Sequence, residues 1–277
     1  MYAKVYVEIT NLCNKNCSFC HGTSRAPRRM TLEEFQKVTG MLGGVTEYLY
    51  FHLMGEPLTH PQLPEFFRHA VKEGFRPVIT TNGTLLPKRG GELLAAGVCK
   101  VNISVHSFEE GSREEYLAYI NGCLDFGDRA SGAGVLTVLR LWNNGYDAGR
   151  NVDTQALIRR RFGGSWQQGR RGIKIRDKLY LEHGERFDWP DLGAVDYGDC
   201  GFCYGLKDQF GVLCDGTVVP CCLDSDGVLA LGNLFEMPLG EILDSPRASA
   251  MREGFARRKA VELLCRRCGY AQRFNKR

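Results

Sequence analysis

The sequence has no uninterrupted apolar run close to the roughly 18 residues that span a bilayer, so we expect no membrane segment. We also expect no secretory leader, because Met1 runs almost directly into a strand-like segment at 5–9. The sequence shows no internal repeats or low-complexity stretches. Apolar residues make up 43% and charged residues 25% of its 277 positions, which excludes disordered, collagen-like and coiled-coil proteins. We therefore expect a globular cytoplasmic protein with one large domain or two unequal ones.

Cysteine is the residue type that the sequence has in excess, with twelve copies. A chain of this length can bury a sizeable core without disulfide staples. Thiols also stay reduced in the cytosol. We therefore interpret these cysteines as sites of metal or redox chemistry.

Strand and helix patterns alternate along the first two thirds of the chain. Apolar or alternating runs predict strands at 4–10, 47–53, 76–81, 99–106, 134–142 and 172–181. Helical patterns lie between them at 31–41, 62–73, 88–96, 112–126 and 153–162. Such alternation predicts an α/β fold with parallel strands joined by crossover helices. Because five or six units are too few for an eight-unit barrel, we expect an open or partial barrel.

The pattern changes after about residue 185. The stretch 189–201, rich in Gly and Asp, is typical of a linker. Asp215-Gly216 between the apolar runs 208–214 and 217–220 predicts a hairpin. Ser245 followed by Pro246 predicts the start of a helix over 246–259. We thus expect a barrel domain over 1–185 and a small α+β domain, built from a hairpin and a helix, over 186–277.

Three cysteines follow the first predicted strand closely. Cys13, Cys17 and Cys20 form a C-x3-C-x2-C pattern. Their thiolates can surround one face of a four-iron cluster and leave one iron open to a small molecule. A zinc knuckle without its fourth ligand and chance clustering are the alternatives.

The cysteine pattern, with the aromatic Phe19 before its last member, resembles that of the radical S-adenosylmethionine (SAM) superfamily. Met54-Gly55-Glu56-Pro57, at the end of the second predicted strand, is similar to the Gly-Gly-Glu-Pro motif of that superfamily, apart from Met54 at the first position. The resemblance implies a partial (β/α)6 TIM-like barrel. It also implies a [4Fe-4S] cluster held by the three cysteines, and a segment from Met54 to Pro57 that binds the amino group of SAM.

Three further polar residues lie on or at the ends of later predicted strands. Ser104 matches a serine that touches SAM in relatives, and Asn82 ends the third predicted strand. Arg140, on the fifth, could face the SAM carboxylate. Each of the three also suits a capping or solvated polar group, so both interpretations stay open.

Four cysteines in the last third of the chain form a second set. Cys203 and Cys221 bracket the predicted hairpin, and Cys265 and Cys268 follow the last predicted helix. With Asp215-Gly216 and Pro220 between them, they resemble the twitch domain, the shortened form of the SPASM domain. The resemblance implies one auxiliary [4Fe-4S] cluster with these four ligands.

Other cysteines leave this ligand set open. Cys200, Cys214 and Cys222 could substitute as ligands. Cys200 with Cys203, and Cys265 with Cys268, also make two C-x2-C pairs, which is a common four-thiolate zinc arrangement.

The resemblance implies an oxidoreductase-type enzyme that cleaves SAM reductively to a 5′-deoxyadenosyl radical, which takes a hydrogen atom from substrate. A peptide or protein side chain that is oxidised or crosslinked ranks first as substrate. The alternatives are a radical epimerase or dehydrogenase of a small molecule of the sugar or aminoglycoside type, and a non-catalytic iron–sulfur or zinc protein. A flavodoxin or ferredoxin would donate the electron, and we expect neither a nucleic-acid nor a membrane partner.

Cys222 and Asp224, which follow the second predicted hairpin strand, are candidate catalytic groups. Sulfatase-maturing relatives place a base carboxylate at the position of Cys222, where this chain has a thiol. That thiol could donate a hydrogen atom, or it could be a buried spectator. Asp224, or Asp226 beside it, is then the candidate base for an oxidation.

Basic residues cluster at 159–161, 170–171 and 245–277. They suit solvated helix faces, or contact with an anionic partner.

Overall fold

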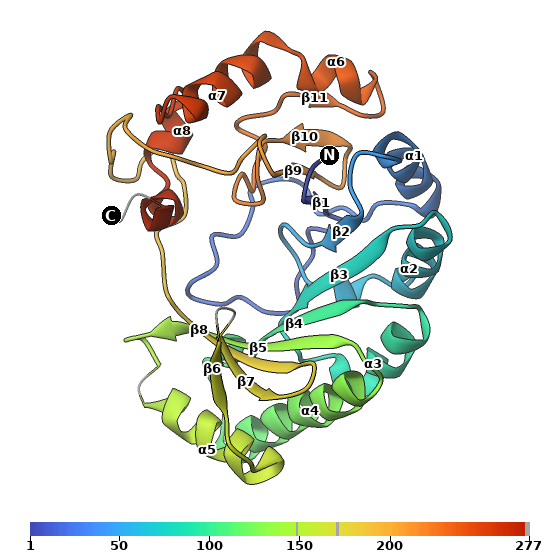
Figure 1. Ribbon diagram of the computed structural model, residues 1–277, viewed down its shortest axis with the longest axis vertical. Coiled ribbons are helices and arrows are strands. Elements are labelled where there is room, and N and C mark those ends of the chain that lie inside the picture. Colours follow the sequence, from blue (N-terminus) through green and yellow to red (C-terminus); the bar gives the residue numbers. More distant parts are fainter. Residues whose placement is uncertain (148, 170–171, 275–277) are drawn as a thin grey trace.

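A computed structural model describes residues 1–147, 149–169 and 172–274. Its strands form one sheet in the order β11-β10-β9-β1-β2-β3-β4-β5-β8-β7-β6. Figure 1 shows this sheet as an arc, with helices α1 to α4 along its outer side and the loop after β1 on its inner side. No described helix is long and apolar enough to cross a membrane.

Six parallel strands form the expected partial barrel. They are β1 (Lys4–Val7), β2 (Tyr48–Phe51), β3 (Arg76–Thr81), β4 (Lys100–Ser104), β5 (Leu136–Asn144) and β8 (Leu179–Glu185). The helices between them are α1 (Leu32–Leu42), α2 (Leu63–Lys72), α3 (Leu86–Ala95), α4 (Arg113–Gly132) and α5 (Arg150–Phe162). The short helices η1 (Pro57–Thr59) and η2 (Val105–Ser107) follow β2 and β4. The α/β partial barrel predicted from the alternation is thus confirmed.

The sixth predicted strand was wrong in its extent. The run 172–181 is divided into β7 (Gly172–Arg176) and β8, which pair antiparallel. The chain reverses between them at Lys178, whose φ is +59, and β8 then pairs in parallel with β5. The last barrel strand is therefore 179–185, and β6 (Gln167–Gly169) with β7 extends the sheet beyond it.

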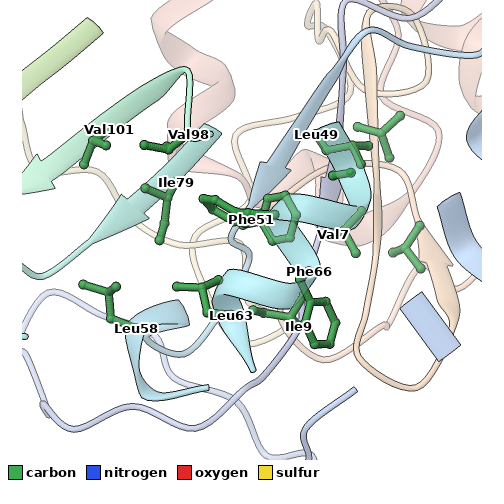
Figure 2. Packing of buried hydrophobic residues seen from close by; sticks show 14 of the residues in the cluster. Val7, Ile9, Leu49, Phe51, Leu58, Leu63, Phe66, Ile79, Val98 and Val101 are labelled. Atoms are coloured by element: carbon green, nitrogen blue, oxygen red, sulfur yellow. The ribbon is translucent and has the colours of Figure 1, made fainter. Parts of the chain in front are cut away.

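Outward-facing residues of the strands pack against the helices. Figure 2 shows Val7, Leu49, Phe51 and Ile79 from three strands in one buried cluster with Phe66 of α2. Because side chains alternate along a strand, the residues between these positions point to the inner side of the arc. That inner face carries polar groups. Among them are Lys4 and Tyr6 on β1, Tyr50 on β2, His52 directly after β2, and Arg140 and Trp142 on β5.

Helix starts follow the expected capping rules. Thr31 caps α1 in a capping box with Glu34, and Ser245 caps α7 with Pro246 as its first residue.

In the first of the basic clusters, the guanidinium of Arg159 stacks on Trp166 and lies 4.0 Å from the centroid of its ring. Residues 170–171 lie outside the described part of the chain.

The C-terminal segment joins the barrel sheet. The hairpin of β9 (Gln209–Val212) and β10 (Thr217–Val219) confirms the predicted turn. β11 (Gly232–Asn233), α6 (Leu239–Leu243), α7 (Pro246–Ala256), α8 (Leu263–Arg266) and η3 (Gly269–Phe274) follow. β9 pairs in parallel with β1, and this pairing places Lys4 opposite Gln209. The boundary between 185 and 186 stays a prediction, because the sheet runs across it.

A buried ion pair ties these parts together. Glu8 is 1% exposed, and both of its carboxylate oxygens accept from Arg25 Nη2 at 2.8 Å. The same oxygens accept from the backbone N–H of Met54 at 3.1 Å and of Cys214 at 3.2 Å. Arg25 Nε also donates to Ser225 O at 2.8 Å. One carboxylate thus connects β1, the loop after it, the segment after β2 and the C-terminal hairpin.

Glu8→Ala should lower the free energy of unfolding by about 3–5 kcal/mol, because it leaves the Arg25 guanidinium without its counter-charge in a buried place. The matched control is Glu65→Ala, which breaks the exposed Arg68–Glu65 pair and should change stability by less than about 0.5 kcal/mol. Urea unfolding of both variants under anaerobic conditions measures the difference. Equal midpoints for the two variants would contradict this role of Glu8.

Candidate active site

The first cysteine set lies in the loop between β1 and α1, coloured blue in Figure 1. Cys13 and Cys20 are exposed, and Cys17 is half-buried. Burial raises the pKa of Cys17 to about 12, and the charges of Glu109, Cys20 and Cys13 act in the same direction. The three thiols therefore lie within electrostatic reach of one another. The Cys17 thiol also donates to the carbonyl oxygen of Ser107, at 3.8 Å.

The segment after β2 packs on the backbone that leads into this loop. Gly55 has a φ of +74, and a Cβ at this position would lie 2.5 Å from Thr10 O and 2.8 Å from Leu12 O. Only glycine fits in this conformation and at this close approach. The next residue, Glu56, donates its backbone N–H to Leu12 O at 2.8 Å. The motif thus holds the start of the cysteine loop in place.

The Glu56 carboxylate joins the ends of β2 and β3. It accepts from Leu58 N at 3.0 Å, Thr81 Oγ1 at 2.7 Å and Asn82 N at 2.6 Å. Burial raises the pKa of Glu56 to about 7, against these three hydrogen bonds, which lower it. Both carboxylate oxygens are therefore already engaged. This geometry favours a positioning role for Glu56 in the predicted SAM site.

Asn82 and Ser104 stand at the carboxyl ends of their strands, where barrel enzymes place their sites. The Nδ2 of Asn82 donates to Asn14 Oδ1 at 2.9 Å and lies 4.0 Å from Cys13 Sγ. Ser104 is half-buried at the end of β4 and pairs with Arg140 in register. Asn82 thus adjoins the first cysteine set directly, and the contact of either residue with SAM stays a prediction.

Arg140 already has protein partners on β5 and β8. Its Nε donates to Glu182 Oε2 at 3.1 Å, and its guanidinium lies 4.6 Å from the ring centroid of Trp142. Glu182 sits opposite Arg140 in the pairing of the two strands. Among the described residues, no acceptor bonds the two Nη atoms of Arg140. Those atoms remain available to an anionic group.

Phe19 packs against the end of β4. Its ring centroid lies 4.8 Å from that of His106, and the guanidinium of Arg186 lies 5.4 Å from the Phe19 ring. Burial lowers the pKa of His106 to about 4, so this ring is neutral near pH 7. A pocket of about 280 Å³ opens beside it, between the cysteine loop and α5. Its lining includes Ser18, His106, Glu109, Asn143, Arg150 and Arg186.

The second cysteine set comes together from distant parts of the sequence. Cys203 precedes β9, Cys221 follows β10, Cys265 lies on α8 and Cys268 follows it. Burial raises the pKa of Cys221 well above its ordinary value, and the charges of the other three add to this effect. All four are half-buried by overall exposure. The fold therefore gathers the four residues that the twitch resemblance selected.

Two of the remaining candidate ligands, Cys200 and Cys214, lie away from this set, whereas Cys222 lies beside it and stays a possible substitute for Cys221. Cys200 is exposed and forms a backbone bridge with Lys259. Cys214 is buried against the ion pair of Glu8 and Arg25, with its thiol 3.7 Å from Arg25 Nη1. The placement of these cysteines favours Cys221 over Cys200 as the fourth ligand of the second set. It therefore favours a four-iron cluster site over a zinc site built from the two C-x2-C pairs.

The donor chemistry of both sets fits iron–sulfur clusters. Thiolates are the usual protein ligands of such clusters, with three or four on each cluster. In the described part of the chain, no three His, Cys, Asp or Glu side chains meet closely enough to bind a single metal ion. A four-iron cluster does not need such a meeting point, because each thiolate binds a different iron atom.

Cys222 lies on the inner side of the barrel. It packs against a small buried cluster of Tyr6, Leu53, Leu213 and Val219. Burial raises the pKa of Cys222, and a hydrogen bond with the Tyr6 hydroxyl acts in the opposite direction. The thiol therefore lies beside the second cysteine set, and its contact with substrate stays a prediction.

The two aspartates that follow have structural partners. Asp224 is 1% exposed, and its two oxygens accept from Val228 N at 2.9 Å and Leu229 N at 2.8 Å. Asp226 accepts from Thr23 Oγ1 at 2.6 Å, which ties the C-terminal segment to the cysteine loop. Asp224 thus closes its own loop, and its catalytic role stays a prediction.

Sequence reasoning missed the groups that anchor the cysteine loop. Glu109 accepts from the backbone N–H of Ser18 at 2.6 Å and pairs with Arg186 at 3.2 Å. Glu8 and Arg25 anchor the other side of the loop. Glu8 had a usable signal, because a carboxylate inside an apolar strand needs a buried partner. Glu109 had none, because it lies in an irregular loop.

Replacing Cys221 should remove the second cluster, whereas replacing Cys200 should not. The test uses a background in which Cys13, Cys17 and Cys20 are Ala, so that only the second site can hold iron. In that background Cys200→Ala should keep about four irons and four sulfides per chain, and Cys221→Ala should lose most of them. Iron and sulfide analysis of anaerobically purified protein measures both. Retention of one zinc and no sulfide would instead support the zinc alternative.

Two family profiles match the chain. That of the radical SAM superfamily matches residues 7–131, and that of an iron–sulfur cluster-binding domain, SPASM, matches residues 203–269. The two matches coincide with the two cysteine sets. SAM, a [4Fe-4S] cluster and an auxiliary cluster site are therefore the cofactors of this chain, and the number of auxiliary clusters stays a prediction.

Individual proteins show the same relationship. The PqqA peptide cyclase of Bradyrhizobium diazoefficiens is 31% identical over 121 residues, which is 42% of this chain and 32% of that protein. The chain matches about a third of the length of such curated relatives. BtrN in complex with AdoMet and 2-DOIA has a TM-score of 0.60 at 17% identity, over 97% of this chain and 93% of that one. The structure of anSMEcpe with AdoMet and the Kp18Cys peptide has a TM-score of 0.62 at 14% identity, over 98% and 90%.

These structural likenesses show the fold, and the two profiles show the family. The cysteine loop, the Gly55-Glu56 segment and the gathered second cysteine set agree with both profiles. The chain belongs to the radical SAM superfamily and carries a SPASM-type iron–sulfur cluster-binding domain in its C-terminal third.

Proposed function

We propose that this protein is a radical SAM oxidoreductase that oxidises or crosslinks a side chain of a peptide or protein. The observation that carries the proposal is the position of the second cysteine set, which adjoins the inner side of the barrel at Cys222. When bound, SAM and the first cluster would supply a 5′-deoxyadenosyl radical that takes a hydrogen atom from substrate. The second cluster would supply an acceptor for the electron left behind. An electron donor of the flavodoxin or ferredoxin type is part of the proposal.

The residues of this chain would hold and shield the reacting groups. Cys13, Cys17 and Cys20 would bind the first cluster, and the backbone at Gly55 and Glu56 would orient SAM beside it. Phe19, whose ring is tilted against that of His106, would shield one side of this region. The burial of His106 keeps its ring neutral, so the wall of the pocket carries no extra charge there.

A peptide substrate is supported by two of the comparisons. The PqqA peptide cyclase is named for a peptide, and anSMEcpe was solved with a bound peptide. Oxidation is supported by the second cysteine set, because hydrogen abstraction followed by loss of an electron needs an acceptor near the substrate. Asp224 accepts two hydrogen bonds within its own loop, which compete with its predicted role as the base of such an oxidation.

A small-molecule epimerase or dehydrogenase is the second candidate. Two features favour it. The Cys222 thiol lies on the inner side of the barrel in contact with Tyr6, where it could donate a hydrogen atom to a substrate radical. BtrN, solved with the small molecule 2-DOIA, also matches this chain over nearly its whole length.

Replacing Cys13, Cys17 and Cys20 together with Ala should abolish the formation of 5′-deoxyadenosine from SAM in the presence of dithionite, because no open iron site remains for SAM. The control is Cys99→Ala, which removes a half-buried thiol at the start of β4 and should leave SAM cleavage unchanged. Chromatography of anaerobic reactions measures the product. A triple variant that still makes 5′-deoxyadenosine would refute the proposed role of the triad.

The two candidate reactions differ in how they use solvent hydrogen. If Cys222 donates a hydrogen atom, wild-type protein in deuterated water should place one deuterium on the product carbon. Cys222→Ala should then still cleave SAM but accumulate oxidised or unquenched substrate. Mass spectrometry of the product distinguishes the cases. Unchanged product without solvent deuterium in either protein would remove the donor role and leave oxidation.

A further inference from the structure

Two cations point into the barrel interior from opposite parts of the arc. Lys4 lies on β1, and its ammonium sits 5.2 Å from the ring centroids of both Tyr6 and Tyr50. Arg140 lies on β5, and β1 and β5 are separated by β2, β3 and β4 in the sheet. Figure 1 shows these strands curving so that β1 and β5 face a shared inner side.

The two cations act on the same groups. Burial lowers the pKa of Lys4, and the positive charge of Arg140 lowers it further. Burial lowers the pKa of His52 to about 3, with Arg140 and Lys4 as the next causes. Both cations also act on the Cys222 thiol. Lys4, His52 and Cys222 all lie against the Tyr6 side chain, and Arg140 is near enough for its charge to act on all three of them.

This space holds an excess of positive charge. Among the described residues, no carboxylate lies within ion-pair distance of the Lys4 ammonium, although Asp208 acts on it from farther away. Arg140 has one counter-charge, Glu182, bound through Nε, and its two Nη atoms have no acceptor in the described chain. Arg273 adds a cation on Trp142, 5.8 Å from the ring centroid. The cations of Lys4, Arg140 and Arg273 thus outnumber the carboxylates of Glu182 and Asp208. The ring of His52 stays neutral.

We propose that Lys4 and the Nη atoms of Arg140 bind a carboxylate of the substrate and so hold the reacting part of the substrate beside Cys222. This inference rests on the proposed function, because it takes the inner side of the barrel to be the substrate site. Two cations held near each other repel, and an anion between them turns this repulsion into attraction. Each oxygen of a carboxylate can accept a charge-assisted hydrogen bond from one of the two cations.

Lys4 could instead serve only to offset the negative charge of a cluster bound by the second cysteine set. This alternative makes a different prediction, because iron retention would then depend on Lys4 while a free carboxylate would gain nothing from it. The predicted contact of Arg140 with the SAM carboxylate also competes for the Nη atoms. No contact between Lys4 and SAM is predicted, so the test is centred on Lys4.

The test compares the alkylation of Cys222 by iodoacetate, which carries a carboxylate, with its alkylation by neutral iodoacetamide. Both react with the same thiolate and lose the same leaving group, so the ratio of their rate constants cancels the ionisation of the thiol. In cluster-loaded wild-type protein, the ratio at Cys222 should exceed that at the exposed Cys200. Lys4→Met should lower the ratio at Cys222 roughly fivefold, as expected for the loss of one nearby charge. Peptide mass spectrometry after timed quenching measures it.

Matched variants distinguish an effect of the Lys4 charge from a structural effect of the substitution. Lys88→Met removes a charge from the exposed side of α3 and should leave the ratio at Cys222 unchanged. Lys4→Arg should restore it. Protection of Cys222 by N-acetyl-aspartate amide more than by succinate would assign the carboxylate to an acidic side chain of a peptide. The reverse order would assign it to a small acid.

Three outcomes would overturn the inference. The ratio at Cys222 could be the same in wild type and Lys4→Met, or Cys222 could resist both reagents. Alternatively, Lys4→Met could lose iron while keeping the ratio, which would assign Lys4 to the cluster. Alkylation needs neither SAM nor reductant, so a failure of the proposed radical chemistry in the SAM-cleavage assay would be recognised separately.

Discussion

The carboxylate of Glu8 is buried, and a buried carboxylate needs donors around it. Its donors come from the cysteine loop at Arg25, from the segment after β2 at Met54 and from the C-terminal hairpin at Cys214. These are the three parts of the chain that build the predicted cofactor sites. Removing the carboxylate would leave a cation and two backbone N–H groups unsatisfied at once, so the relative position of all three parts depends on this one group.

A second set of contacts that hold the cysteine loop in place lies at the ends of the strands. Gly55 lets the chain come close to the cysteine loop, and Glu56 then joins β2 to β3 through three hydrogen bonds. Glu109 performs a similar task on the far side, where it holds Ser18 and Arg186. The loop that carries the three cysteines is irregular, yet groups from the segments after β1, β2 and β4 restrain it. Such restraint lets exposed thiols keep a fixed separation before a cofactor binds.

Local patterns predicted most of this architecture, because strand and helix periods and capping residues act over short stretches. They failed where the outcome depends on distant partners. The run 172–181 has the composition of one strand, but the turn at Lys178 and the pairing of β8 with β5 divide it. The two cysteine sets could be found from spacing and resemblance. The engagement of Asp224 by its own loop, and that of Arg140 by Glu182, could not, because both follow from side-chain geometry that no spacing encodes.

The parallel pairing of β1 with β9 has a consequence for how the chain acquires its structure. Lys4 is matched with Gln209, so β1 finds its partner on one side only after the chain has been synthesised as far as β9. Contacts of such long sequence separation form slowly, because a large loop must close first. Until then the edge of β1 exposes unpaired backbone groups, which are a template for pairing with other chains. The nascent barrel therefore passes through an interval in which its β1 edge is open to pairing with other chains.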